Sequence, residues 1–594
     1  MMKVHVTTIS IFLMACSLYA AEYHVSPNGL DSNKGSKSNP FNTISAAAHI
    51  AQPGDTIIVH DGTYRERVNP PRGGTSDDKR IVYQAAPGEK VVIKGSEVVT
   101  GWEKVQNDTW EIVLPNSFFG SHNPYKIEVH GDWFNPLGGN NRVYHTGSVY
   151  LNGHWLSEAA SKEQVLKPEG NTPLWFGEVD DERTTIHAQF KGVDPNAQTV
   201  EINVREAVFY PEKPGMNYIT VRGFTMEHAA PNWAPPTAEQ VGLIGSHWSK
   251  GWVIESNTIR YSICTGITLG KYGDEWDNRA QSAKGYVGTI NRALKNGWSK
   301  QNIGHHVVRD NHISHCEQAG IVGSMGAIFS TVTGNTIHEI NMRGLFGGAE
   351  MSGIKFHGAI DAVISHNHIY RCGGHGGGIW LDWMAQGTRV TRNLLHDNNK
   401  DLFMEVNHGP FLIDHNLFMS RNSLRDWSQG GAYVHNLFAG SLNFKKDHRQ
   451  TPYFKPHSVT DMKGSSIQDK DLRFYNNIFI GRKDLPALVG SKLVQDSGNV
   501  FLDKVSFALE KKAAEFLLTI PKQSAEASAQ KRGIVTTELL GKAKIPDAPF
   551  EKPDGTPYRL DTDYFRKKRN TTPSPGPFKA QDNKEIHLKV WPKK

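Results

Sequence analysis

Two short apolar stretches decide how this chain folds: Gly378-Ile379-Trp380-Leu381-Asp382-Trp383 and Asp401-Leu402-Phe403-Met404-Glu405-Val406, the second continuing as Asn407-His408-Gly409-Pro410. Each reads as a β-strand with an acid near its end, and the acids at 382 and 405 are 23 residues apart. An asparagine follows each acid 11 positions later, at 393 and 416. The two stretches therefore hold the same position in successive units of a repeat.

The repeat is an asparagine followed by an apolar residue, and it runs through the second half of the chain. Between Asn311 and Asn436 successive members are 20 to 32 residues apart, a period typical of the three-strand coils of a parallel β-helix with loops inserted in some coils. Stacked asparagine amides can bond one another at a tight turn, which is a structural role. A β-propeller would need longer, four-stranded repeats and fits less well. The members are Asn257, Asn311, Asn335, Asn367, Asn393, Asn416, Asn436 and Asn477.

The predicted fold class is all-β, a right-handed parallel β-helix with an inserted β-sandwich. The repeat is absent from about residue 97 to 206, where strands alternate polar and apolar residues, as in Thr199–Val204. An alanine-rich helix at Ser45–Ala51 would cover the open end of the solenoid. We expect a loop over one face at 271–300 and a helical patch at 507–518. The predicted segments are 1–21, signal peptide; 22–96, cap and first coils; 97–206, sandwich; 207–502, main β-helix with the active site; 503–594, an extension packing on the solenoid.

Composition fits a soluble globular protein, with 38% hydrophobic and 21% charged residues. The net charge of +6 is small for 594 residues, and no dense basic run precedes the C-terminal tail, so we expect no nucleic-acid partner. Three cysteines follow the predicted signal, and we expect them to be small buried residues and not a disulfide framework or metal site. They are Cys264, Cys316 and Cys372.

Residues 1–21 resemble a secretory signal, with Lys3 before a short apolar run and Leu18-Tyr19-Ala20 as a cleavage site. The run is too short to span a bilayer, so we expect no membrane span. Leu13-Met14-Ala15-Cys16 loosely resembles a lipoprotein cleavage site, which leaves a lipid anchor open. The expected location is secreted or periplasmic. The sequence specifies no oligomeric state.

Alternation along the strands assigns a face to each side chain of the repeat. The second and fourth positions of the two stretches are Ile379, Leu381, Leu402 and Met404, which we place in the core. The outward positions, together with the preceding Gly353–His357 strand, are Lys355, Trp380 and Phe403 in one row and His357, Asp382 and Glu405 in the other. Outward aromatic residues beside two acids indicate a groove and not a plain solvated face.

The two acids suit glycoside hydrolysis by their expected separation. Adjacent coils stack about 4.7–4.9 Å apart, so the carboxyls should be roughly 5 Å apart. Retaining glycosidases need about 5–5.5 Å and inverting enzymes about 6.5–9.5 Å. A like charge at that distance also raises one carboxyl pKa, as a general acid requires. The same acids could instead bind a cation such as Ca²⁺ or lie in solvent, although their neighbours are mainly Trp, Phe, Met and His.

The Trp-Leu-Asp-Trp and Met-Glu-Val-Asn-His-Gly-Pro motifs, set in an interrupted β-helix, resemble glycoside hydrolase family 120, the β-xylosidases. The resemblance covers most of the chain from Tyr23 to about Phe501. It implies an exo-acting, retaining enzyme that releases xylose from xylo-oligosaccharides or related plant or algal glycans by double displacement. It implies Asp382 as nucleophile and Glu405 as general acid/base, with an oligosaccharide as substrate and no cofactor.

Further candidates surround the acids, and we expect none of them to bind a metal. Lys355 is a candidate salt-bridge partner of either acid, and His375 has no favoured role. Trp133 could reach over from the sandwich to close a pocket, but we interpret it as a core aromatic. Glu350 could equally stabilise its glycine-rich turn. The predicted substrate-binding residues are Glu350, His357, Trp380, Trp383, Asn407 and His408.

Two other functions compete with glycoside hydrolysis. A polysaccharide lyase would need a Lys or Arg base and a partner for a uronate, and Lys355 is the only evident base by the groove. A non-catalytic glycan-binding solenoid would show an aromatic stripe over many coils, whereas the outward aromatics cluster on two.

Overall fold

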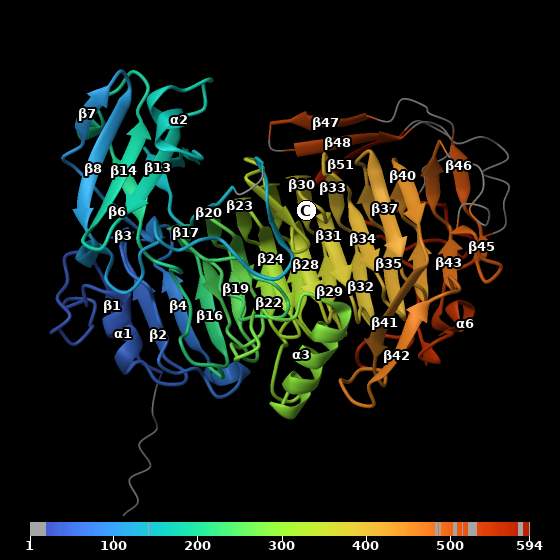
Figure 1. Ribbon diagram of the computed structural model, residues 1–594. Coiled ribbons are helices and arrows are strands. Elements are labelled where there is room, and N and C mark those ends of the chain that lie inside the picture. Colours follow the sequence, from blue (N-terminus) through green and yellow to red (C-terminus); the bar gives the residue numbers. More distant parts are fainter. Residues whose placement is uncertain are drawn as a thin grey trace, which may run out of the picture.

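The computed structural model describes residues 20–592 except 140–141, 482–484, 486–488, 503–507, 514, 521–531 and 580–585. The predicted signal peptide therefore lies almost wholly outside the described residues. The chain forms a right-handed parallel β-helix whose three long faces are parallel sheets (Figure 1). One apolar core runs through its length and contains Ile379, Leu381, Leu402 and Met404 as predicted. Among the described residues, no helix has both the length and the apolar character needed to cross a membrane.

The first two sheets have thirteen and twelve strands. The first consists of β1 Glu22–Val25, β2 Thr56–Val59, β4 Ile81–Ala85, β16 Ile219–Arg222, β19 Val253–Glu255, β22 Val307–Arg309, β25 Thr331–Thr333, β29 Val363–Ser365, β32 Thr388–Thr391, β35 Phe411–Asp414, β38 Gly431–Val434, β43 Leu472–Tyr475 and β45 Gln495–Ser497. The second consists of β3 Gly62–Tyr64, β5 Val91–Lys94, β17 Thr225–Ala229, β20 Thr258–Ser262, β23 His312–Cys316, β26 Thr336–Ile340, β30 His368–Cys372, β33 Leu394–His396, β36 Leu417–Phe418, β39 Leu437–Phe438, β44 Ile478–Ile480 and β46 Val500–Leu502.

The third sheet has eight strands and carries both acids. Its members are β18 Ile244–Gly245, β21 Thr265–Thr268, β24 Ala319–Ser324, β28 Ser352–His357, β31 Gly377–Asp382, β34 Leu402–Glu405, β37 Asn422–Trp427 and β40 Ser441–Phe444. Every pairing in this sheet is parallel, so a residue of one coil lies beside the residue at the same position of the next.

The repeat asparagines form the predicted ladder at the turn between the first and second sheets. In one typical rung the Asn393 Nδ2 donates to Asn416 Oδ1 at 2.9 Å and to the Ile364 carbonyl at 3.0 Å. The backbone N–H of Asn393 donates to the same Asn416 oxygen. The ladder continues from Asn257 to Asn499, so buried turn amides are satisfied from coil to coil. The prediction of a structural role for these asparagines is confirmed.

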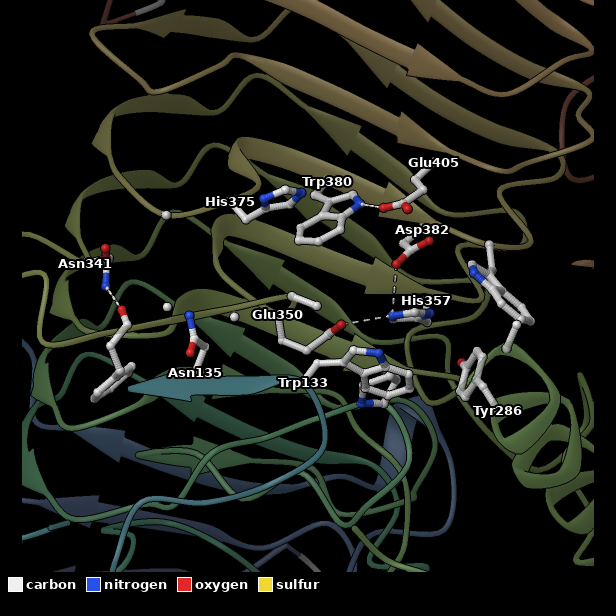
Figure 2. Close-up of a pocket in the computed structure, with 18 of the residues that line it drawn as sticks. Trp133, Asn135, Tyr286, Asn341, Glu350, His357, His375, Trp380, Asp382 and Glu405 are labelled. Carbon is white, nitrogen blue, oxygen red and sulfur yellow. Dashed lines mark hydrogen bonds and ion pairs between the residues drawn. The ribbon is translucent and has the colours of Figure 1, made fainter. Parts of the chain in front are cut away.

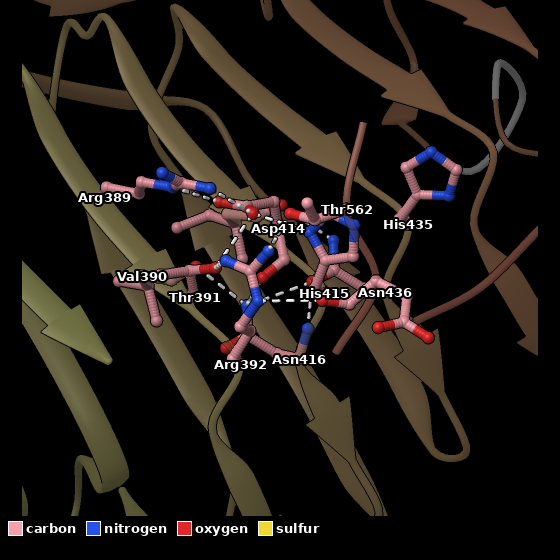
Figure 3. Close-up of polar contacts among 12 residues, drawn as sticks. Arg389, Val390, Thr391, Arg392, Asp414, His415, Asn416, His435, Asn436 and Thr562 are labelled. Carbon is pink, nitrogen blue, oxygen red and sulfur yellow. Dashed lines mark hydrogen bonds and ion pairs between the residues drawn. The ribbon is translucent and has the colours of Figure 1, made fainter. Parts of the chain in front are cut away.

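The C-terminal region contacts the outside of the solenoid. Arg392, which precedes a ladder asparagine, donates from Nη2 to Thr562 Oγ1 at 2.8 Å and from Nε to the Asp563 carbonyl at 3.0 Å (Figure 3). On the adjoining strands Arg389 forms a bidentate pair with the buried Asp414, at 2.7 and 2.8 Å. Apolar residues of the same region, including Tyr564, pack on the outer side of the second sheet. The remaining elements here are β47 Ala508–Lys512, β48 Glu515–Ile520, α6 Thr537–Leu540, β49 Lys542–Ala543, β50 Ala548–Pro549 and β51 Ile586–Trp591.

The inserted segment forms two sheets with their own apolar core and extends an arm along the solenoid. The arm is β9 Phe134–Pro136, which pairs antiparallel with β27 Phe346–Gly348 of the β-helix. Gly348 permits this approach, because its φ is +149° and a Cβ there would lie 2.5 Å from the Trp133 carbonyl oxygen. The other elements are β6 Ser96–Val98, β7 Glu103–Gln106, β8 Thr109–Pro115, η2 Asn116–Phe119, β10 Val149–Leu151, β11 His154–Trp155, β12 Ser157–Glu158, α2 Lys162–Leu166, β13 Leu174–Val179, β14 Arg183–Gln189, η3 Pro195–Ala197 and β15 Val200–Asn203.

Two local predictions are wrong. Residues 271–300 contain the helix α3 Ala283–Lys295, which packs apolar residues such as Tyr286 and Ile290 beside the site, and not only a loop. Within the expected helix at 507–518, the described residues 508–512 and 515–518 belong to the antiparallel strand pair β47–β48, to which β51 adds a third strand. Ser282 caps the start of α3, and one side of that helix is buried, whereas pairing with β51 stabilises β48 as a strand. The remaining elements are α1 Ile44–Ile50, η1 Asp77–Lys79, β41 Asp447–Tyr453 and β42 Lys463–Ile467.

Cys264, Cys316 and Cys372 are buried and unpaired, as expected.

Asn393→Ala is expected to lower the free energy of unfolding by about 2–3 kcal/mol. It removes the acceptor of the buried Asn367 N–H, one of the two acceptors of Asn367 Nδ2, and the side-chain donor to the Ile364 carbonyl. Urea denaturation followed by circular dichroism measures the change. The exposed Asn28→Ala is the matched control and should change stability little. Equal stability of the two variants would contradict the ladder's energetic role.

Candidate active site

The site is a row of outward side chains across three adjacent strands of the third sheet. In the register of β28, β31 and β34, His357 lies beside Asp382 and Asp382 beside Glu405. The parallel row places Lys355 beside Trp380 and Trp380 beside Phe403. The structure thus brings together both rows deduced from the sequence.

His357, Asp382, Glu405 and Trp380 of these rows form the floor of a cavity of about 820 Å³ (Figure 2). The arm of the insertion contributes Trp133 and Asn135, helix α3 contributes Tyr286, and strand β41 contributes Arg449. Three parts of the chain that are distant in sequence therefore close a groove on the sheet into a pocket. Asp382 and Glu405 are each only 6% exposed.

Asp382 is surrounded by positive charge. The ammonium of Lys355 lies 2.7 Å from Asp382 Oδ2, and His357 Nε2 lies 3.4 Å from the same oxygen. Burial alone would raise the pKa of Asp382, but Lys355, His357 and Arg449 outweigh burial and hold the pKa below its usual value. Asp382 is therefore an ionised carboxylate at neutral pH, and among the described residues its Oδ1 has no hydrogen-bond partner.

The pKa of Glu405 is shifted in the opposite direction, upward. Trp380 Nε1 donates to its Oε2 at 3.0 Å, and Arg449 Nη2 donates to its Oε1 at 2.5 Å. Burial and the adjacent negative charge of Asp382 raise the pKa of Glu405 to about 7, although Arg449 and Lys355 act in the other direction. Near pH 7 this carboxyl can both give and accept a proton. A nucleophile must stay charged, as Asp382 does, and a general acid/base must exchange protons, as Glu405 can. The two carboxyls therefore suit acid/base chemistry combined with a nucleophile.

Glu350, His357 and Asp382 lie close enough together to share a metal ion, with ligand atoms within 4.8 Å of one another. However, the Lys355 ammonium already lies among them, 2.7 Å from Asp382 and 3.5 Å from Glu350 Oε1. It also lies 3.3 Å from the centre of the Trp380 ring. Lys355 therefore supplies the positive charge here and is not placed as the free base that a lyase would need.

Most of the predicted binding residues line the cavity: Glu350, His357, Trp380 and Trp383. Two do not. Asn407 is buried in the turn after Glu405, where its Nδ2 donates to the Leu381 carbonyl and its Oδ1 accepts from the Ala385 N–H. His408 is bound by Thr451 and Gln429. The chain turns at Val406, with φ +48°, and this turn directs both side chains away from the cavity.

Other lining residues were missed or misjudged. Trp133 lies in the cavity wall and is not the core aromatic that was expected, and His375 also lines the cavity. Tyr286 lay within a predicted loop, and Arg449 showed no sequence signal because it comes from a hairpin outside the repeat. The antiparallel pairing of β41 with β42 and the ion pair of Arg449 with Asp447 position Arg449 at Glu405.

Comparisons with known proteins agree with this geometry. Residues 99–174 match the family model described as "Glycoside hydrolase 120, insertion domain", residues 242–447 match "Right handed beta helix region", and residues 27–69 match a model of unknown function. A solved structure, "The complex structure of XylC with xylose", is 40% identical, with a TM-score of 0.90 over 96% of this chain and 100% of that chain. "Uncharacterized protein YwoF" of Bacillus subtilis (strain 168) is 31% identical over 144 residues, and the match spans 24% of this chain and 28% of that protein.

The near-complete match to XylC and the family-specific insertion agree with the paired carboxyls in a closed pocket. The chain belongs to glycoside hydrolase family 120 and is a β-xylosidase-like glycosidase.

Proposed function

We propose that this enzyme is a retaining, exo-acting β-xylosidase in which Asp382 is the nucleophile and Glu405 the general acid/base. The observation that carries the proposal is the opposite shift of the two pKa values on neighbouring strands, downward for Asp382 and to about 7 for Glu405. The structural similarity to a protein solved with xylose supports xylose as the sugar released. The expected substrates are xylo-oligosaccharides or related plant or algal glycans.

The reaction divides between the two acids. The Asp382 carboxylate attacks the anomeric carbon while the protonated Glu405 gives its proton to the leaving oxygen, which breaks the glycosidic bond. The second step reverses the roles: the Glu405 carboxylate takes a proton from water, and the hydroxide displaces Asp382. Adjacent strands are about 4.8 Å apart, a spacing that supports the double displacement over an inverting reaction.

The cavity supports exo action. Trp133 from the insertion, Tyr286 from α3 and Glu350 close one end of the site around the acids. A chain that continued past this end would meet the arm and the helix. One terminal sugar therefore fits at the closed end, and the rest of the substrate extends the other way.

We also propose that the enzyme is exported to the periplasm or secreted, with Cys16 as the candidate lipid attachment point. The support is the sequence of residues 1–21 alone. Fractionation of cells expressing the chain and its Cys16→Ala variant measures this, and retention of both in the cytoplasm would contradict it.

Asp382→Asn is expected to lower kcat on an aryl β-xyloside by about three orders of magnitude or more, because it removes the nucleophile. Glu405→Ala should lose activity less on an aryl xyloside with a good leaving group, and azide should restore part of it, since azide needs no general base. Formation of the glycosyl azide is followed by NMR. Full activity of Asp382→Asn, or no azide product from Glu405→Ala, would contradict the assigned roles.

The pH profile of kcat/KM is expected to fall on its alkaline side near pH 7, because a general acid must be protonated and the pKa of Glu405 is about 7. Arg449 lowers the pKa of both acids, so Arg449→Gln should move both limbs of the profile to higher pH. The exposed Lys446→Gln is the control with the same loss of charge. An unmoved or downward-shifted alkaline limb in Arg449→Gln would show that Glu405 is not the group that titrates.

A further inference from the structure

Trp380 lines the cavity, yet both faces of its indole ring are already covered. Its neighbours in the outward row are Lys355 and Phe403, on the two strands that flank β31 on opposite sides. The Phe403 ring stacks on the indole, with ring centroids 5.0 Å apart and an interplanar angle of 20°. The Lys355 ammonium lies over the ring, 3.3 Å from its centre. Only 2% of Trp380 is exposed, so a sugar has no face of this ring on which to stack.

The edge of the Trp380 ring is directed at Glu405. Its Nε1 donates to Glu405 Oε2 at 3.0 Å, and both side chains are buried (Figure 2). Among the described tryptophans, Trp380 is the one whose indole N–H donates to a carboxylate, since the other bonded indoles donate to backbone carbonyls or to an amide oxygen. An indole N–H can only donate, so this contact always presents a donor to Oε2.

Two donors, one on each oxygen, fix the plane of the Glu405 carboxyl. Arg449 binds Oε1 from a hairpin outside the repeat, and its side chain is 34% exposed. Trp380 binds Oε2 from the floor of the cavity, held between Phe403 and Lys355. The indole is therefore the more rigid of the two donors. A general acid needs such support, because its proton must lie on the line to the leaving oxygen.

We propose that Trp380 is a positioning residue for Glu405 and not a stacking platform for the sugar, with its indole N–H directing the carboxyl toward the leaving oxygen. This inference rests on the proposed role of Glu405 as the general acid/base. The N–H should matter most when the leaving group must receive a proton, and little when the leaving group departs as a stable anion. A residue that stacked on the xylose would serve both kinds of substrate alike.

The test compares phenyl β-D-xyloside, whose leaving group needs a proton, with 2,4-dinitrophenyl β-D-xyloside, whose leaving group does not. The measured quantity is kcat/KM, which covers the steps up to cleavage of the glycosidic bond. Trp380→Phe keeps an aromatic ring between Phe403 and Lys355 but has no N–H. It is expected to lower kcat/KM about tenfold for the phenyl xyloside and about twofold or less for the dinitrophenyl xyloside.

Trp427→Phe is the matched control, because Trp427 lies beside Glu405 on the next strand, does not line the cavity and donates to Asn443. Its ratio of the two kcat/KM values should equal that of the wild type. Equal losses on both substrates in Trp380→Phe would overturn the proposal. If the wild type hydrolyses neither xyloside, the β-xylosidase function itself is wrong, and the two failures are thereby distinguished.

A second measurement does not depend on the folding of Trp380→Phe. In the wild-type enzyme with ¹⁵N-labelled indole groups, one indole N–H resonance should shift as the pH passes through about 7, the pKa of Glu405. The same shift should vanish in Glu405→Gln, which does not titrate. If no indole resonance depends on Glu405 in this way, the hydrogen bond that carries the proposal is not formed in solution.

Discussion

The in-register hydrogen bonding of β31 with β34 is the constraint on which the site depends. It fixes Asp382 beside Glu405 at the spacing of adjacent strands, about 4.8 Å, without help from any flexible loop. The asparagine ladder maintains this register, because each amide ties the turn of one coil to the next. Since a one-residue shift of either strand would send its acid into the core, the register and the chemistry cannot vary independently.

Two acids this close raise each other's pKa, and in identical surroundings the two shifts would be the same. Lys355 and His357 lie on the Asp382 side, one strand further along the sheet, and they stabilise its charge. Glu405 has Trp380 as a neutral donor and Arg449 as its cation, and the latter also binds Asp447. The asymmetry therefore arises from the order of side chains across successive strands, with Lys355 in one coil and the acids in the next two. Burial under the insertion and α3 amplifies each of these charges.

Much of this arrangement could be predicted from the sequence because it is periodic. Alternation assigned Asp382, Glu405, Trp380 and His357 to one outward face, and the repeat placed them on adjacent coils. The parts that failed are not periodic. Asn407 was expected at the substrate, but a turn with positive φ at Val406 rotates it into the wall. Arg449 and Trp133 reach the cavity through antiparallel pairings that are not part of the three long parallel sheets, and no local pattern specifies these pairings.

The central claim is that the Asp382 and Glu405 carboxyls act by double displacement at the spacing that the strands impose. The most direct measurement is the anomeric configuration of the first sugar released from an aryl β-xyloside, followed by ¹H NMR before mutarotation. The account predicts that β-xylose appears first and the α-anomer accumulates later. Initial appearance of α-xylose would show inversion and would contradict the account.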